Sequence, residues 1–221
     1  MRKVVQLFAV IGVLAWVPLE AQARSGQGWS VLTGETVGSN NNVIHAQAGW
    51  PGISATWLHG YTPTVDFGGI FTFNYGVEGD VNNVHPELKV QGLAKATLME
   101  TPKYNLGVWF APGPLLIFYP SSPFFGSTTT FGLSFATGLI FGLPVSNVVN
   151  VAFNFDLPMF VTFGTFGSFA VPILFGGGVE YFLEKNMALT FNLRMGPIIY
   201  TAFGGGTNFD LQALFGLAFK L

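Results

Sequence analysis

The chain contains no cysteine and few charged residues, and each shortage excludes a class of protein. Without cysteine in its 221 residues, the chain forms no disulfide and carries out no thiol chemistry. This absence is compatible with passage through an oxidising periplasm. Charged residues make up 9% of the chain, against about 25% in soluble domains, so an ordinary soluble surface is excluded. The formal net charge of -2 gives no reason to expect nucleic acid as a partner.

Apolar residues are abundant instead, which indicates lipid as the solvent for much of the surface. They account for 50% of the chain, with 24 Phe and 29 Gly. Because hydrocarbon tolerates no unpaired backbone polar group, only helices or a closed β-barrel remain. Residues 131–153 and 157–179 are uncharged and long enough for helices, but they are rich in Gly, Thr, Phe and Pro. Polar residues recur in them at alternate positions, which favours strands.

The first residues predict export from the cytoplasm. Arg2 and Lys3 precede a nearly unbroken apolar run over residues 4–17, and Ala21-Gln22-Ala23 follows as an A-x-A cleavage pattern. The alternative is a helical membrane anchor, but the run is shorter than the roughly 20 residues that a span needs. We therefore expect a cleaved signal peptide over residues 1–23.

The last stretch, residues 209–221, alternates strictly between apolar and more polar side chains. Counted from Leu221, every second residue back to Phe209 is apolar, and both charged residues of the stretch, Asp210 and Lys220, fall on the other set. A period of two predicts a strand with one apolar face. An apolar face this rich in Phe and Leu is typical of the closing strand of an outer-membrane barrel.

The same alternation recurs through the preceding sequence and predicts an all-β, antiparallel up-and-down transmembrane barrel over residues 42–221. We count about ten strands, with eight or twelve as alternatives, and an even number is usual in bacterial barrels. Residues 24–41 are Gly-, Ser- and Asn-rich and are interpreted as a periplasmic tail or an extra strand. The strands before 209–221 are expected at residues 43–50, 53–57, 67–78, 87–98, 106–110, 131–143, 149–157, 171–181 and 187–195.

These features resemble the small Gram-negative outer-membrane barrels of the OmpA-like type. The resemblance rests on the signal peptide, the alternating strands, Gly177-Gly178-Val179-Glu180-Tyr181 before the turn at Glu184-Lys185-Asn186, and the apolar alternating end. It implies an outer-membrane location, insertion by the barrel-assembly machinery, and contacts with outer-membrane lipids and lipopolysaccharide. No part of the chain resembles the soluble domain that some such proteins append.

In this alternation every charged strand residue points into the barrel. Paired charges that fill a narrow lumen are one interpretation, since buried charges need partners. A small polar pore is the other. Barrels of about eight strands are filled by their own side chains, so we expect a largely filled lumen. The lumen-facing residues are Asp66, Glu78, Lys89, Lys95, Asp156, Glu180, Arg194, Asp210 and Lys220.

Three histidines are the candidates for catalysis, as in barrels that act as lipid hydrolases or proteases. His45 is expected in the lumen, His59 near a periplasmic turn and His85 in a loop. No nucleophile elbow or paired-carboxylate spacing accompanies them, and no two have metal-ligand spacing. We expect no catalytic residue, metal or cofactor.

The segment 111–130 reads as a Pro-rich loop but carries many apolar residues. Either the flanking strands continue beyond the bilayer and pair there, or the loop forms an exposed apolar patch. Such a patch would bind a hydrophobic ligand, lipopolysaccharide acyl chains or a partner protein. Its residues would be Leu115, Leu116, Ile117, Phe118, Phe124 and Phe125.

Together these patterns predict a non-enzymatic outer-membrane barrel with a structural or surface-interaction role. The first alternative is a narrow channel for small solutes or hydrophobic molecules. A barrel lipid hydrolase or protease is the last alternative.

Overall fold

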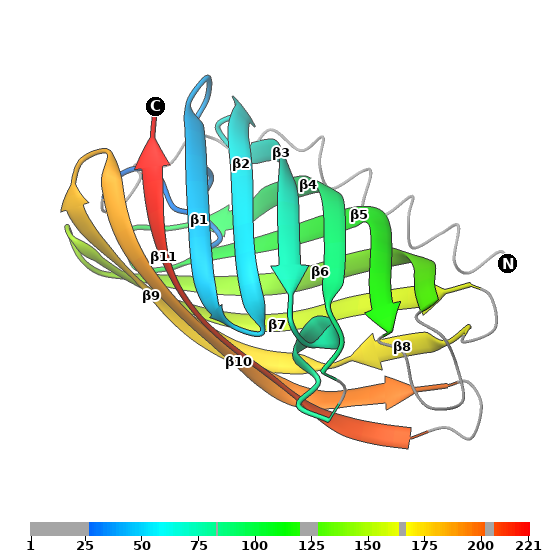
Figure 1. The fold of residues 1–221 in the computed structure, drawn as a ribbon. Coiled ribbons are helices and arrows are strands. Elements are labelled where there is room, and N and C mark those ends of the chain that lie inside the picture. The colour runs from blue at the N-terminus through cyan, green and yellow to red at the C-terminus, as the bar shows by residue number, and fades with distance from the viewer. Residues whose placement is uncertain (1–26, 83, 120–127, 164–166, 202–205) are drawn as a thin grey trace, which may run out of the picture.

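The computed structural model describes residues 27–82, 84–119, 128–163, 167–201 and 206–221. The predicted signal peptide, residues 1–23, lies outside this part of the chain. The described residues form a single wall of strands and one short 3₁₀ helix (Figure 1). Within them, no helix is long and apolar enough to cross a membrane. The elements are β1 (Asn42–Trp50), β2 (Gly52–Thr62), β3 (Val65–Asn74), η1 (Val77–Gly79), β4 (Glu87–Glu100), β5 (Asn105–Tyr119), β6 (Thr128–Ser146), β7 (Val149–Thr162), β8 (Phe169–Pro172), β9 (Leu174–Glu184), β10 (Met187–Tyr200) and β11 (Gly206–Lys220).

The strands form a closed antiparallel up-and-down barrel, as predicted. Apart from β8 and β9, each strand pairs with its neighbours in sequence, and β1 pairs with β11 to complete the ring. Strands β8 and β9 are separated only by Ile173, and both pair with β7 on one side and β10 on the other. They share one position in the wall, so the barrel has ten positions, in agreement with the expected number.

The period-two alternation separates an apolar outer surface from a more polar interior. On β11, Phe215 is 66% exposed, whereas Asp210 is fully buried. Outward apolar side chains recur on other strands, for example Trp57 on β2 and Phe153 on β7. Successive strand residues point to opposite faces, so the sequence pattern alone places these side chains.

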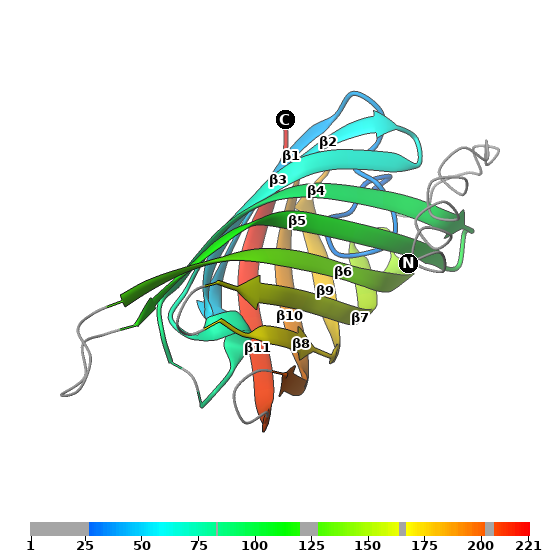
Figure 2. The same cartoon turned by 90° about the vertical axis from the view of Figure 1, so that its right-hand side faces the viewer.

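The two ends of the barrel differ in their connections. The turn end carries the short links 63–64, 101–104, 147–148 and 185–186, together with the start of β1 and the end of β11. At the loop end the strand pairs β3–β4, β5–β6, β7–β8 and β10–β11 are each separated by more residues, and β1 and β2 are joined by a tight turn (Figures 1 and 2). Short periplasmic turns and long extracellular loops are the usual asymmetry of outer-membrane barrels.

The segment 111–130 differs from the loop that its prolines suggested. Strand β5 continues to Tyr119 and pairs with β6 from Thr128 onward. Pro112 and Pro114 fit because the β4–β5 ladder is interrupted between Phe110 and Leu115. A proline lacks the backbone N–H that a ladder needs, so it is tolerated where pairing stops.

Of the two interpretations of this segment, the structure agrees with the first, in which the strands continue and pair, and not with the exposed apolar patch. Leu115 and Ile117 are buried inside the barrel, whereas Leu116 is half-buried and Phe118 is exposed on the outer face. The alternation persists through the prolines, so these four residues are divided between two faces and form no single patch. Phe124 and Phe125 lie outside the described residues.

A charged residue on the outer face should destabilise the barrel in lipid. Phe215 lies opposite Ala48 of β1 and Phe191 of β10, within the paired part of both ladders. We expect Phe215→Arg to lower the free energy of unfolding by at most about 4 kcal/mol, which is the cost of an arginine on the lipid face at the bilayer midplane. Urea unfolding in lipid vesicles measures the change, and Phe215→Leu is the matched control. Equal stability of the two variants would contradict a lipid-facing position.

Candidate functional site in the barrel lumen

The turn end of the lumen is occupied by the residues that precede β1. The described part of this region, residues 27–41, is called the N-terminal segment; it is neither a free tail nor a strand. Trp29 and Val37 are fully buried, and they belong to one apolar cluster with residues of β1, β2, β9, β10 and β11. In both overall views the dark blue trace before β1 lies within the ring of strands (Figures 1 and 2).

Lys95 holds the N-terminal segment through its backbone. The ammonium of Lys95, on β4, donates to the carbonyl of Ser30 at 3.0 Å and to the carbonyl of Glu35 at 2.5 Å. Thr97 lies two residues after Lys95 on β4, and its hydroxyl donates to the carbonyl of Gly34 at 2.7 Å. All of these groups are buried, so the segment's carbonyls supply the acceptors that a buried cation needs.

Two buried carboxylates bind the backbone N–H groups of the same segment. Val37 donates to Asp66 Oδ2 at 3.0 Å, and Val31 donates to Glu180 Oε1 at 3.0 Å. The other oxygen of Glu180 accepts from the Asn150 amide at 3.0 Å. Hydrogen bonds from backbone N–H groups stabilise a carboxylate away from water, so the lumen charges and the segment satisfy one another.

Apolar and close backbone contacts fix the segment further. The Trp29 ring packs edge-on against Phe182 at 5.1 Å between ring centroids, and its indole N–H donates to the carbonyl of Lys185 at 2.8 Å. Gly34 lies directly against the backbone of Gly107 on β5, where a Cβ would collide. The segment is therefore packed against the wall on opposite sides of the lumen.

The middle of the lumen is crossed by an ion pair. Arg194 Nη1, on β10, lies 3.2 Å from Asp156 Oδ2, on β7. The indole of Trp109 donates to the other oxygen of Asp156 at 3.0 Å. Trp109 therefore points into the barrel.

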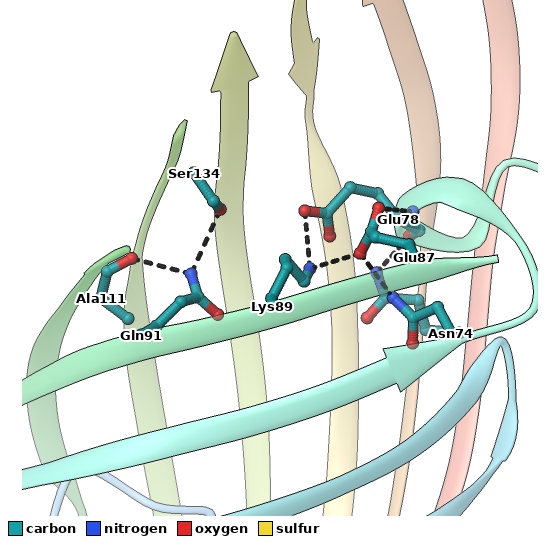
Figure 3. Close-up of polar contacts among 8 residues, drawn as sticks. Asn74, Glu78, Glu87, Lys89, Gln91, Ala111 and Ser134 are labelled. Atoms are coloured by element: carbon teal, nitrogen blue, oxygen red, sulfur yellow. Dashed lines mark hydrogen bonds and ion pairs between the residues drawn. The ribbon is translucent and has the colours of Figure 1, made fainter. Parts of the chain in front are cut away.

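A second segment of the chain folds into the loop end of the lumen. Residues 75–82, called the mouth loop, include η1 and bring Glu78 beside Lys89 and Glu87 of β4 (Figure 3). The Lys89 ammonium lies 2.6 Å from Glu78 and 3.1 Å from Glu87. Glu87 also accepts from the backbone N–H of Glu78 at 3.1 Å and from the Asn74 amide at 2.9 Å.

The predicted lumen charges thus fall into three groups along the barrel. Asp66, Lys95 and Glu180 bind the N-terminal segment, Asp156 and Arg194 cross the middle, and Glu78 and Lys89 pair at the mouth. Glu78 lies in η1 and not on the predicted strand 67–78, because β3 ends at Asn74 and the chain turns into the lumen.

Two of the predicted charges take no part in the contacts described for these groups. Asp210 is fully buried beside Gly79, and neither of its carboxylate oxygens has a hydrogen-bond partner among the described residues. Lys220 is partly buried at the turn end, opposite Val43.

The sequence pattern missed the N-terminal segment because this segment lacks the alternation of a strand. Its signal was the presence of Trp29, Leu32 and Val37 among Gly, Ser, Thr and Asn. Large apolar residues in a polar stretch indicate burial somewhere, but they do not identify the surface that buries them.

The histidines have separate surroundings. His45, in the lumen, lies 2.9 Å from the Thr190 hydroxyl, and His59 lies 3.1 Å from the Asn42 side chain. His85, in the loop after β3, packs 4.7 Å from the Tyr119 ring, and burial lowers its pKa. Within the described ranges, no group of three or more His, Cys, Asp or Glu residues could hold a metal ion.

Comparisons with known proteins add one structural similarity. No protein-family model and no curated protein matches the chain. Among solved structures, it is similar to the crystal structure of the outer membrane protease OmpT from Escherichia coli, with a TM-score of 0.49 and 11% sequence identity. The similarity covers 83% of this chain and 94% of that chain. The barrel fold follows from the strand pairing of this chain itself.

Removing the Lys95 charge should loosen the N-terminal segment and leave the barrel intact. Lys95→Met keeps the length of the side chain but leaves the carbonyls of Ser30 and Glu35 without their donor. We expect hydrogen exchange of the N-terminal segment to accelerate about tenfold, because local opening becomes easier. Lys103→Met, in an exposed turn, is the control. Unchanged exchange in Lys95→Met would show that this contact does not hold the segment.

Proposed function

We propose that the chain is a non-enzymatic outer-membrane barrel of a Gram-negative cell envelope, closed along its lumen, with a structural or surface-interaction role. The observation that carries this proposal is the N-terminal segment, which lies inside the barrel and binds Lys95, Asp66 and Glu180. A role that requires flow through the lumen conflicts with a segment of the same chain packed there.

The size of the barrel supports a closed lumen. A wall of about eight strands has an interior that side chains just fill, and open porins have 16 or more. The extra room of ten positions is taken up by the N-terminal segment at one end and the mouth loop at the other. The Asp156–Arg194 pair and Trp109 occupy the space between them.

The outer surface supports the proposed location. Aromatic and aliphatic side chains such as Trp57, Phe153 and Phe215 are exposed on it, and such a surface needs lipid around it. With the predicted signal peptide, this supports an outer-membrane protein of the OmpA-like type. Its proposed partners are outer-membrane lipids and lipopolysaccharide, and the barrel-assembly machinery during insertion.

Conductance in planar bilayers tests the closed lumen against the channel alternative. We expect the purified barrel to give no stable current steps, because the N-terminal segment and the Asp156–Arg194 pair obstruct the path. Stable steps that change in Lys95→Met or Arg194→Met would overturn the proposal, since they would show ions passing these side chains. Lys103→Met, outside the lumen, controls for a general effect of charge.

Hydrolysis assays test the enzyme alternative. We expect the purified protein to cleave neither phospholipid nor peptide, since His45 contacts Thr190 inside a closed lumen. An activity that is lost in His45→Ala but kept in His59→Ala would contradict the non-enzymatic role.

A further inference from the structure

The mouth loop is held in the lumen by two kinds of contact from different strands. Val77 is buried in an apolar cluster with Leu115 and Ile117 of β5, Phe160 of β7 and Ile198 of β10. Polar contacts hold the residues that follow Val77. The loop therefore contacts strands from several sides of the barrel mouth and covers it.

The polar contacts form two separate anchors. At the first, Glu78 pairs with Lys89, and its backbone carbonyl accepts from the Gln212 amide at 2.7 Å. At the second, Asp80 accepts from the Tyr200 hydroxyl and from the Asn208 amide, each at 2.7 Å. Strands β4, β10 and β11 thus each contribute at least one contact.

The backbone of the mouth loop is strained between these anchors. Glu78 has a φ of 51° and Gly79 a φ of 98°. Glycine adopts a positive φ readily, but a glutamate does so at a cost in free energy. Such strain persists only where surrounding contacts hold it, and it is common in segments that switch between conformations. Here the contacts that hold Glu78 are its pair with Lys89 and its hydrogen bonds to Glu87 and Gln212.

At the first anchor one cation contacts two carboxylates. Lys89 lies between the carboxylates of Glu78 and Glu87, and all three side chains are buried. Without Lys89 the two carboxylates would repel each other in a medium that screens charge poorly. Glu87 belongs to β4, so the repulsion would act on Glu78 and drive the mouth loop outward.

The lumen wall beneath the mouth loop continues toward the N-terminal segment. Gln91, one inward position deeper than Lys89 on β4, donates to the Ser134 hydroxyl at 3.2 Å and to the Ala111 carbonyl at 2.9 Å (Figure 3). Ser134 is fully buried. A reagent therefore reaches a side chain at position 134 only when the packing around it opens.

We propose that the mouth loop is a latched lid, which opens when Glu78 leaves Lys89 and exposes the loop-end half of the lumen to the outside. This inference rests on the proposed closed barrel and adds to it. The N-terminal segment blocks the turn end permanently, whereas the loop end opens and closes. Release of the strain at Glu78 favours opening, and the Lys89 and Tyr200 contacts favour closure.

Cysteine accessibility tests the lid, because the natural chain has no cysteine. Ser134→Cys reports on the lumen beneath the lid, Val77→Cys on the lid itself, and Val84→Cys, at a position 58% exposed, on reagent access in general. A membrane-impermeant maleimide is applied to intact cells. With Lys89 present we expect slow labelling at residues 134 and 77 and fast labelling at residue 84.

The latch, which is the pair between Glu78 and Lys89, is tested by adding Lys89→Met to each cysteine variant. We expect labelling at residues 134 and 77 to rise about tenfold, as for a local opening equilibrium that loses one buried contact, while labelling at residue 84 is unchanged. Lys103→Met is the matched control. Tyr200→Phe removes only the hydroxyl bound to Asp80, so we expect a smaller rise in the labelling rate at residues 134 and 77. This variant replaces Lys89→Met if the Lys89→Met protein does not fold into a barrel.

The outcomes separate the lid from the closed barrel. Labelling at residue 134 that is as fast as at residue 84 with Lys89 present, or that stays slow in both latch variants, would overturn the lid. Either result leaves the conductance test of the closed lumen unaffected. Stable current steps in the planar bilayer that change in Lys95→Met or Arg194→Met would instead overturn the closed lumen, whatever the labelling shows.

Discussion

The pairing of β1 with β11 is the constraint on which the rest of the structure depends. It aligns Val43 with Lys220 at one end and Trp50 with Ala213 at the other, so the sheet has no free edge there. In hydrocarbon an unpaired edge would leave a row of N–H and C=O groups without partners. Closure allows an outer surface of Phe, Leu and Val to face lipid, and it forces every alternate side chain into a confined interior.

That confined interior explains why the chain folds back into its own barrel. Inward positions collect charged side chains such as Lys95, Asp66 and Glu180, which need partners once they are removed from water. Much of what they bind is backbone: carbonyls of the N-terminal segment for Lys95, and N–H groups for the two carboxylates. A backbone segment supplies donors and acceptors together, so one stretch satisfies charges of both signs.

The N-terminal segment and the mouth loop are held in the lumen by different kinds of contact, which is consistent with different roles. The N-terminal segment combines Trp29 packing with a close backbone approach at Gly34 and leads directly into β1. The mouth loop lies between β3 and β4 and holds Glu78 in a strained conformation against a single lysine. The first is fixed by packing over its length, whereas the second depends on a few contacts at its tip.

Local alternation determined most of the wall. The ten positions, the inward charges and the direction of Trp109 all follow from period two, because a strand residue has only two faces available. The pattern failed where local signals conflicted with pairing. Prolines 112 and 114 suggested a loop, but the interrupted β4–β5 ladder accommodates them. Glu78 seemed to continue β3, but no strand partner extends that far.

The sequence by itself therefore determined the barrel, its apolar outer surface and the residues that point inward, since these depend on contacts between neighbouring strands and on alternation. Only the tertiary structure decided what fills the lumen. The partners of Lys95 and Glu180 lie 60 and 149 residues away along the chain, and no local pattern encodes such distances. The closed ring brings these groups together, and burial then favours the arrangement in which Lys95 and Glu180 bind the N-terminal segment.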